Sequence, residues 1–80
     1  MEDMIKLSER IDTQGSTKEI IDLWFTGQGF RVIVARFRSG PVLSKQFGQW
    51  DLGMHDVSAE QASAVYQTSQ QRYRRWPLAA

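Results

Sequence analysis

The 80-residue chain has no cysteine and a single histidine. Without cysteine, neither a disulfide framework nor a thiolate zinc site can form, and small secreted domains usually depend on disulfides. We therefore expect a reducing, cytoplasmic location. The chain also lacks a run of about eighteen apolar residues, and its N-terminus alternates charged and apolar residues where a signal peptide would have an apolar core. The sequence thus predicts no membrane insertion.

Side chains suited to catalysis or metal binding are scarce. His55 has no second histidine or cysteine with which to share a metal, so we interpret it as a loop residue. A serine–histidine–aspartate arrangement would need His55 to serve Ser58 or another serine, with Asp51 or Asp56 behind it. Residues so close in sequence seldom converge on one substrate, and no glycine-rich elbow surrounds any serine. Gly27-Gln28-Gly29 is half of a dinucleotide fingerprint and leads into an expected strand, not a helix. We predict no enzyme, no metal site and no cofactor.

The length allows one domain, residues 1–80, with one thin core. Hydrophobic residues make up 41 % of the chain and include three Trp, four Phe and two Tyr, which is enough to fold. No segment combines low hydrophobicity with high charge, the composition typical of disorder.

Thr26-Gly27-Gln28-Gly29 is the strongest local signal and predicts a β-hairpin. The flanking segments 20–25 and 30–37 are rich in β-branched and aromatic residues, and the glycines can supply the positive φ angles of a two-residue turn. Either such turn sets odd positions of the first strand opposite even positions of the second. We expect the core face to consist of Ile21, Leu23, Phe25, Phe30, Val32 and Val34.

The remaining N-terminal and central segments are less uniform. The turn signal Ser39-Gly40-Pro41 precedes residues of β character at 42–47, so 18–47 is predicted as a β-meander. Residues 49–56 are interpreted as a packed loop. Residues 1–15 fit either a strand or a short helix, and we favour a strand that ends in a turn at 12–15. The sequence of residues 16–19 matches a capping box, which leaves a helical alternative open for 20–25.

A helix is predicted over 57–76. Ser58 can cap it, Gln61 occupies the capping-box position, and Pro77 ends it. An apolar stripe at spacings of three and four consists of Ala62, Val65, Tyr66, Ser69, Tyr73 and Trp76. The predicted fold class is therefore α+β, an antiparallel sheet of three or four strands with one C-terminal amphipathic helix packed on one face.

Two surfaces are candidates for binding. The sheet face opposite the core is unusually apolar, and its predicted partner-binding residues are Ile20, Trp24, Arg31, Ile33 and Phe37. We expect so apolar a face to be shielded from solvent by a protein partner, by the N-terminal segment or by a second copy of the chain in a homodimer. The second surface is basic, for a protein or nucleic acid, and comprises Arg36, Arg38, Lys45, Arg72, Arg74 and Arg75. Complementing the helix macrodipole is a sufficient structural explanation for the arginines of the last helical turn.

Two family resemblances bear on function. The segment FRVIVARFRSGPVLSKQFG (30–48), followed by a capped helix, resembles the three-stranded-sheet arm-type DNA-binding domain of tyrosine integrases and implies DNA binding. The small size, lack of cysteine, hairpin core and single helix resemble the small anti-CRISPR proteins of phages and mobile elements. This second resemblance, which we favour, implies an inhibitor that binds a CRISPR effector, such as a type I surveillance complex, and blocks target DNA engagement. A net charge of +1 favours steric blocking over DNA mimicry.

Overall fold

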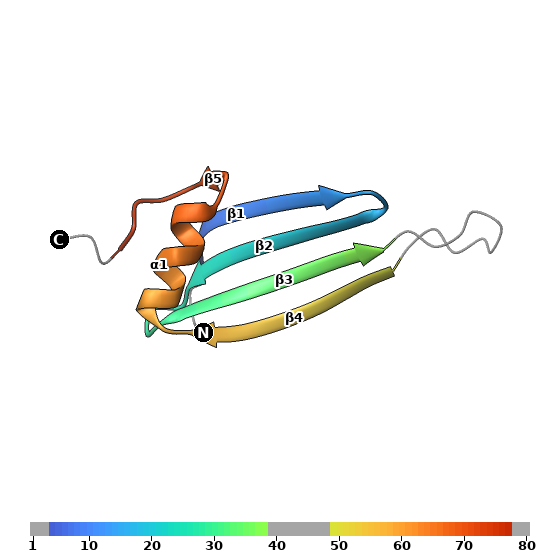
Figure 1. The fold of residues 1–80 in the computed structure, drawn as a ribbon. Helices are drawn as coiled ribbons and strands as arrows, with labels where there is room; N and C mark the ends of the chain where they lie inside the picture. The colour runs from blue at the N-terminus through green and yellow to red at the C-terminus, as the bar shows by residue number, and fades with distance from the viewer. Residues whose placement is uncertain (1–3, 39–48, 78–80) are drawn as a thin grey trace.

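The computed structural model describes residues 4–38 and 49–77 (Figure 1). In chain order the elements are β1 (Ile5–Gln14), β2 (Thr17–Phe25), β3 (Phe30–Arg38), β4 (Gln49–Val57), α1 (Ala59–Thr68) and β5 (Gln71–Arg72). The strands form one antiparallel sheet in the order β4-β3-β2-β1-β5. The predicted α+β class is confirmed, and the two-residue β5 brings the strand number to five.

The β2–β3 hairpin has the predicted parity. Gly27 adopts a φ of 88°, and the turn is closed by the Thr26 amide, which donates to the Gly29 carbonyl at 2.9 Å. Phe25 pairs with Phe30 and Leu23 with Val32, so the expected core residues share one face. The helical alternative for 20–25 is wrong, because that segment is paired on both sides, with β1 and with β3.

Residues 5–14 of the N-terminal segment form a strand, as we favoured. The strand continues through 12–14, where a turn was expected, and Gly15, with a φ of 58°, begins the turn into β2. A bulge between Lys6 and Ser8 interrupts its pairing with β2. The bulged residue, Leu7, is buried, so the irregularity turns an apolar side chain into the core.

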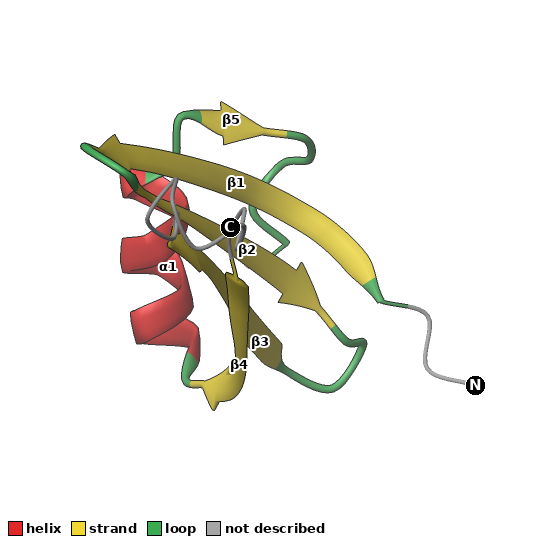
Figure 2. Ribbon diagram, turned by 90° about the vertical axis from the view of Figure 1, so that its right-hand side faces the viewer, coloured by secondary structure: helices red, strands yellow, loops and turns green. Residues whose placement is uncertain are grey.

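The core lies where α1 crosses one end of the sheet (Figure 2). α1 contacts β1, β2 and β3, and its ten residues are much shorter than the nine- and ten-residue strands, which extend well beyond the helix (Figure 1). The buried apolar cluster consists of Leu7, Leu23, Phe30, Val32 and Ala62. One end of the sheet is therefore two layers thick and the other end is a single layer (Figure 1).

Residues 49–56 form most of strand β4 and are not a loop, which corrects our interpretation. Every residue from Gln49 to Val57 pairs with β3 without a register shift. Asp51, Gly53 and Asp56 disfavour a strand locally, but the continuous ladder to β3 outweighs that preference. The strand expected at 42–47 lies outside the described residues.

The helix ends at Thr68 and not at residue 76. Ser69 caps it in an extended conformation. The buried Ser69 hydroxyl donates to the Val65 carbonyl at 2.8 Å and is hydrogen-bonded to the Ser8 hydroxyl at 3.1 Å, from which it can accept. The chain then turns back as β5 and pairs with β1. Trp76 still packs on the core, but from this returning tail, where its ring stacks on Phe30 at 4.9 Å.

Candidate functional site

The sheet face opposite α1, called the open face here, carries an apolar patch. Leu52, Ala35, Ile20 and Ile11 lie directly opposite one another and form a row across all four long strands. Ile33 and Met54, which pair with each other, lie in the adjacent row. These residues, Ile11, Ile20, Ile33, Ala35, Leu52 and Met54, constitute the apolar patch.

The most exposed members of the apolar patch lie in the outer strands. Leu52 is 75 % exposed, Met54 64 % and Ile11 36 %, whereas Ile20, Ile33 and Ala35 are half-buried. A large contiguous exposed apolar surface is uncommon on a monomer and marks an interaction site more often than single exposed residues do.

All five residues that were predicted for the sheet face opposite the core lie on the open face, namely Ile20, Trp24, Arg31, Ile33 and Phe37. Trp24 pairs with Arg31, Ile20 with Ala35, and Lys18 with Phe37. The structure adds Ile11, Leu52 and Met54. Leu52 and Met54 were missed because β4 had been interpreted as a loop, although their alternation with Asp51, Gly53 and His55 was a signal for a strand.

Charged pairs occupy the other end of the open face, near the β2–β3 turn. The Lys6 ammonium lies 2.5 Å from Glu9 Oε2 and 3.4 Å from Asp22 Oδ1. The Arg31 guanidinium lies 3.0 Å from Asp56 Oδ1 and therefore pairs with β4. Beside them, Trp24 Nε1 is buried with no hydrogen-bond partner among the described residues.

The Lys6, Glu9 and Asp22 side chains change one another's protonation. Burial raises the pKa of Asp22, and its hydrogen bond with Glu9 raises it further. The hydrogen bond from Lys6 lowers the pKa of Glu9 despite partial burial. Burial lowers the pKa of Lys6, but its hydrogen bond to Glu9 and the attraction of Asp22 outweigh that effect and raise it. The cluster thus holds one carboxylate firmly ionised and a second one less so.

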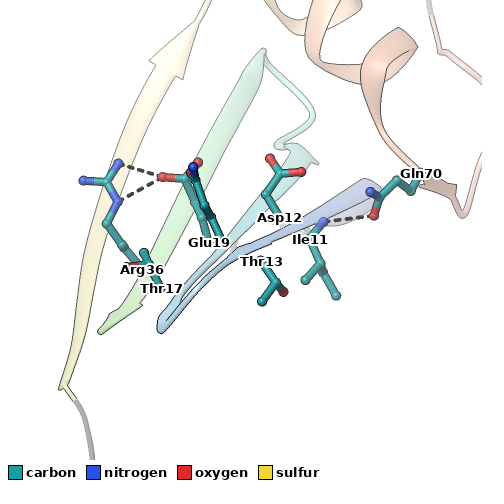
Figure 3. Close-up of a pocket in the computed structure, with 8 residues that line it drawn as sticks. Ile11, Asp12, Thr13, Thr17, Glu19, Arg36 and Gln70 are labelled. Carbon is teal, nitrogen blue, oxygen red and sulfur yellow. Dashed lines mark hydrogen bonds and ion pairs between the residues drawn. The ribbon is translucent and has the colours of Figure 1, made fainter. Parts of the chain in front are cut away.

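A polar hollow of about 700 Å³ lies on the other face, beyond the end of α1 (Figure 3). Asp12, Glu19 and Arg36 come from β1, β2 and β3, and Arg36 donates two hydrogen bonds to Glu19 Oε2, at 2.6 and 3.0 Å. Gln70 closes one side by accepting from the Ile11 amide at 3.2 Å. The hollow is wide open to solvent, and its cation is already paired.

Those predicted basic side chains that the structure describes are not gathered into one surface. Arg36 is paired with Glu19, while Arg72 donates to the carbonyls of Tyr66 at 3.0 Å and Gln67 at 2.6 Å. Arg72 thus complements the C-terminal end of the helix from β5, and not from a last helical turn. Arg74 and Arg75 are exposed on the tail. Lys45 and the side chain of Arg38 lie outside the described residues.

Other types of site receive little support from the described residues. His55 lies in β4 and not in a loop, with its Nε2 3.3 Å from where a Cβ at Gly53 would lie. Within 4–38 and 49–77, no three His, Asp or Glu side chains are grouped as metal ligands. In the same part of the chain, no helix is long and apolar enough to cross a bilayer.

Comparison of the chain with protein-family models, with curated proteins and with solved structures gives no match.

Proposed function

We propose that this protein acts by binding another protein through the open face. The observation that supports the proposal is the apolar row across β1 to β4, in which Ile11 and Leu52 are exposed at the two ends. An apolar centre beside ion-paired side chains is the usual composition of a protein interface, with a dry core and a polar rim. No catalytic step is part of this proposal.

The anti-CRISPR resemblance makes a CRISPR effector the first partner class to test. In that case the protein would cover an effector surface in the host cytoplasm and block target DNA sterically. Arg31 is neutralised by Asp56 and Lys6 by Glu9 and Asp22, so contact through the open face should depend mainly on apolar burial. Binding should therefore persist as salt is raised.

A double substitution in the apolar patch tests the proposal. Ile11→Asp with Ile20→Thr introduces a charge on the exposed edge of the patch and keeps a β-branched residue at its centre. We expect capture of a purified type I surveillance complex to weaken at least tenfold while the thermal unfolding curve remains cooperative. Gln67→Glu, an acidic change on the exposed surface of α1, is the matched control and should bind like the unsubstituted protein.

The outcomes separate the partner from the surface. If the complex is captured equally by the double variant, the open face is not the binding surface. If the unsubstituted protein captures no surveillance complex, the CRISPR partner is excluded. Retention on duplex DNA that falls steeply with salt and requires Arg74 and Arg75 would favour the integrase-like alternative.

A further inference from the structure

The two edges of the sheet differ. The outer side of β1 is partly covered, because β5 pairs with Ser8 and Glu9 and the Tyr73 amide donates to the Leu7 carbonyl at 2.8 Å. β4 is the opposite edge, and no described element lies beyond it (Figure 1). Its outward N–H and C=O groups therefore have no partner strand within 4–38 and 49–77, and such a row is a template for another strand.

β4 also lacks the usual features that prevent strand addition. Between Gln49 and Val57 there is no proline, lysine or arginine, and the pairing with β3 has no bulge. Edge strands that remain unpaired are commonly short, bulged or protected by lysine and proline. Two aspartates, Asp51 and Asp56, are the acidic residues of this strand, so any partner strand has to accommodate them.

We propose that the occupant of this edge is a second copy of the chain, which pairs β4 with β4 antiparallel about a two-fold axis at Gly53. Because this axis is perpendicular to the sheet, the open faces of the two copies lie on the same side of the combined sheet. An even-numbered residue of β4 can therefore lie opposite only an even-numbered residue of the second copy, and an odd-numbered one opposite only an odd-numbered one. Centring on Gly53 sets Leu52 opposite Met54 of the second copy, and Asp51 opposite His55 of the second copy. The strand is thus complementary to itself in both hydrophobicity and charge.

Both aspartates are satisfied in this arrangement. An imidazole N–H can donate to the Asp51 carboxylate across the interface, whatever the protonation state of His55. Asp56 keeps its ion pair with Arg31 inside its own copy. Leu52 and Met54, 75 % and 64 % exposed, gain apolar neighbours across the interface on the open face.

The dimer has a consequence for the open face. Because the axis keeps equivalent faces together, the apolar patches of the two copies lie on the same side and adjoin at Leu52 and Met54. The combined sheet would present one apolar surface about twice as wide as that of a single copy. The dimer itself rests on the edge strand and does not require the open face to bind a partner.

Cysteine cross-linking tests the pairing and its register, because the native chain has no cysteine. Leu52→Cys and Met54→Cys are exposed changes that can be made in separate proteins. Cross-strand neighbours lie within disulfide reach, whereas diagonal ones, about 7–8 Å apart, lie beyond it. We expect a mixture of the two variants to form a mixed disulfide dimer under mild oxidation, and either variant alone to remain largely uncross-linked.

Sedimentation equilibrium of the unsubstituted protein provides the second measurement, with twice the chain mass expected at micromolar concentrations. His55→Asp sets two carboxylates opposite each other and should raise the dissociation constant at least tenfold, while the neutral control His55→Asn should change it little. A monomer at all accessible concentrations overturns the proposal. A dimer whose single-cysteine variants cross-link with themselves overturns the register centred on Gly53. Cross-linking and sedimentation are both measured on the protein alone. The dimer can therefore be confirmed or overturned whether or not the Ile11 and Ile20 substitutions weaken partner capture.

Discussion

Truncation of Trp76 probes the packing of the returning tail. Its ring is stacked on Phe30, 4.9 Å away with an interplanar angle of 6°, and lies 5.3 Å from the ring of Tyr66. The tail is held against the helix by the Tyr66 hydroxyl, which donates to the Arg74 carbonyl at 2.7 Å. Trp76→Ala would remove these ring contacts and expose Phe30, which is now only 6 % exposed.

The expected loss follows from the burial of Trp76. Replacing a fully buried aromatic residue with alanine costs about 3–5 kcal/mol, and aromatic pairs contribute about 0.5–1.5 kcal/mol beyond their burial. Because Trp76 is only half-buried, we expect a loss of about 2–3 kcal/mol. For a domain of this size that loss lowers the Tm by about 10–20 °C. A core this thin is expected to leave a total stability near the lower end of about 5–15 kcal/mol, so the change should be large relative to the whole.

Urea denaturation followed by far-ultraviolet circular dichroism measures this loss. Tyr73→Ala is the matched control, since Tyr73 is in the same tail but 52 % exposed. Its loss should stay below about 1 kcal/mol, the contribution of an exposed aromatic near the Lys6 ammonium. If Trp76→Ala costs less than about 0.5 kcal/mol, or no more than Tyr73→Ala, the tail does not complete the core and the reasoning fails.

Three further predictions concern the helix cap, the end of the helix, and the pair of carboxylates beside Lys6. Ser58→Ala removes the hydroxyl that accepts from the Gln61 amide at 3.1 Å and should cost about 1 kcal/mol in urea denaturation. The mid-helix change Ala64→Ser should cost only the lower helix propensity of serine, about 0.5 kcal/mol. Arg72→Ala should lower the Tm by a few degrees because two helix-end carbonyls lose their donor, whereas Arg75→Ala should not. Glu9→Gln should destabilise the protein at neutral pH, because a lowered folded-state pKa contributes stability that is lost as the pH falls through that pKa. Asp22→Asn should stabilise the protein at neutral pH. The raised folded-state pKa of Asp22 means that the folded protein loses stability as the pH rises through that pKa and the carboxylate ionises. The stability difference between this variant and the unsubstituted protein should therefore disappear in acid. Unfolding curves at pH 7 and pH 3 that show the same sign for both variants would contradict this assignment.

Local patterns predicted the centre of the fold and not its periphery. The glycines of the β2–β3 turn set a parity that placed Leu23 in the core and Trp24 on the open face, because a two-residue period follows directly from the turn. β4 was missed because Asp51 and Gly53 are poor strand residues, and the ladder to β3 that holds them is not visible in their own sequence.

The end of the helix was mispredicted for a similar reason. Tyr73 and Trp76 continue the apolar spacing of α1, so periodicity alone extends the helix to residue 76. The interaction that stops it joins Ser69 to Ser8, which is far away in the sequence and buried beneath the helix. The residues at the centre of the open face could be predicted from the parity of β2 and β3. Leu52, at its exposed margin, could not be predicted, because it lies in β4 and that strand was not recognised.

The short helix on a long sheet divides the protein into parts of unequal local stability. Under α1, strand opening must break the packing around Leu23 and Val32, so those amides should exchange with solvent only on global unfolding. At the far end, around Gln14 and Thr17, the strands are held together by ladder hydrogen bonds and the Arg36–Glu19 ion pair, and local openings should be frequent. The apolar row crosses the strands at Ile11 and Ile20, between this far end and the core, so we expect it to adjust to the surface of a partner while the packing under α1 stays intact.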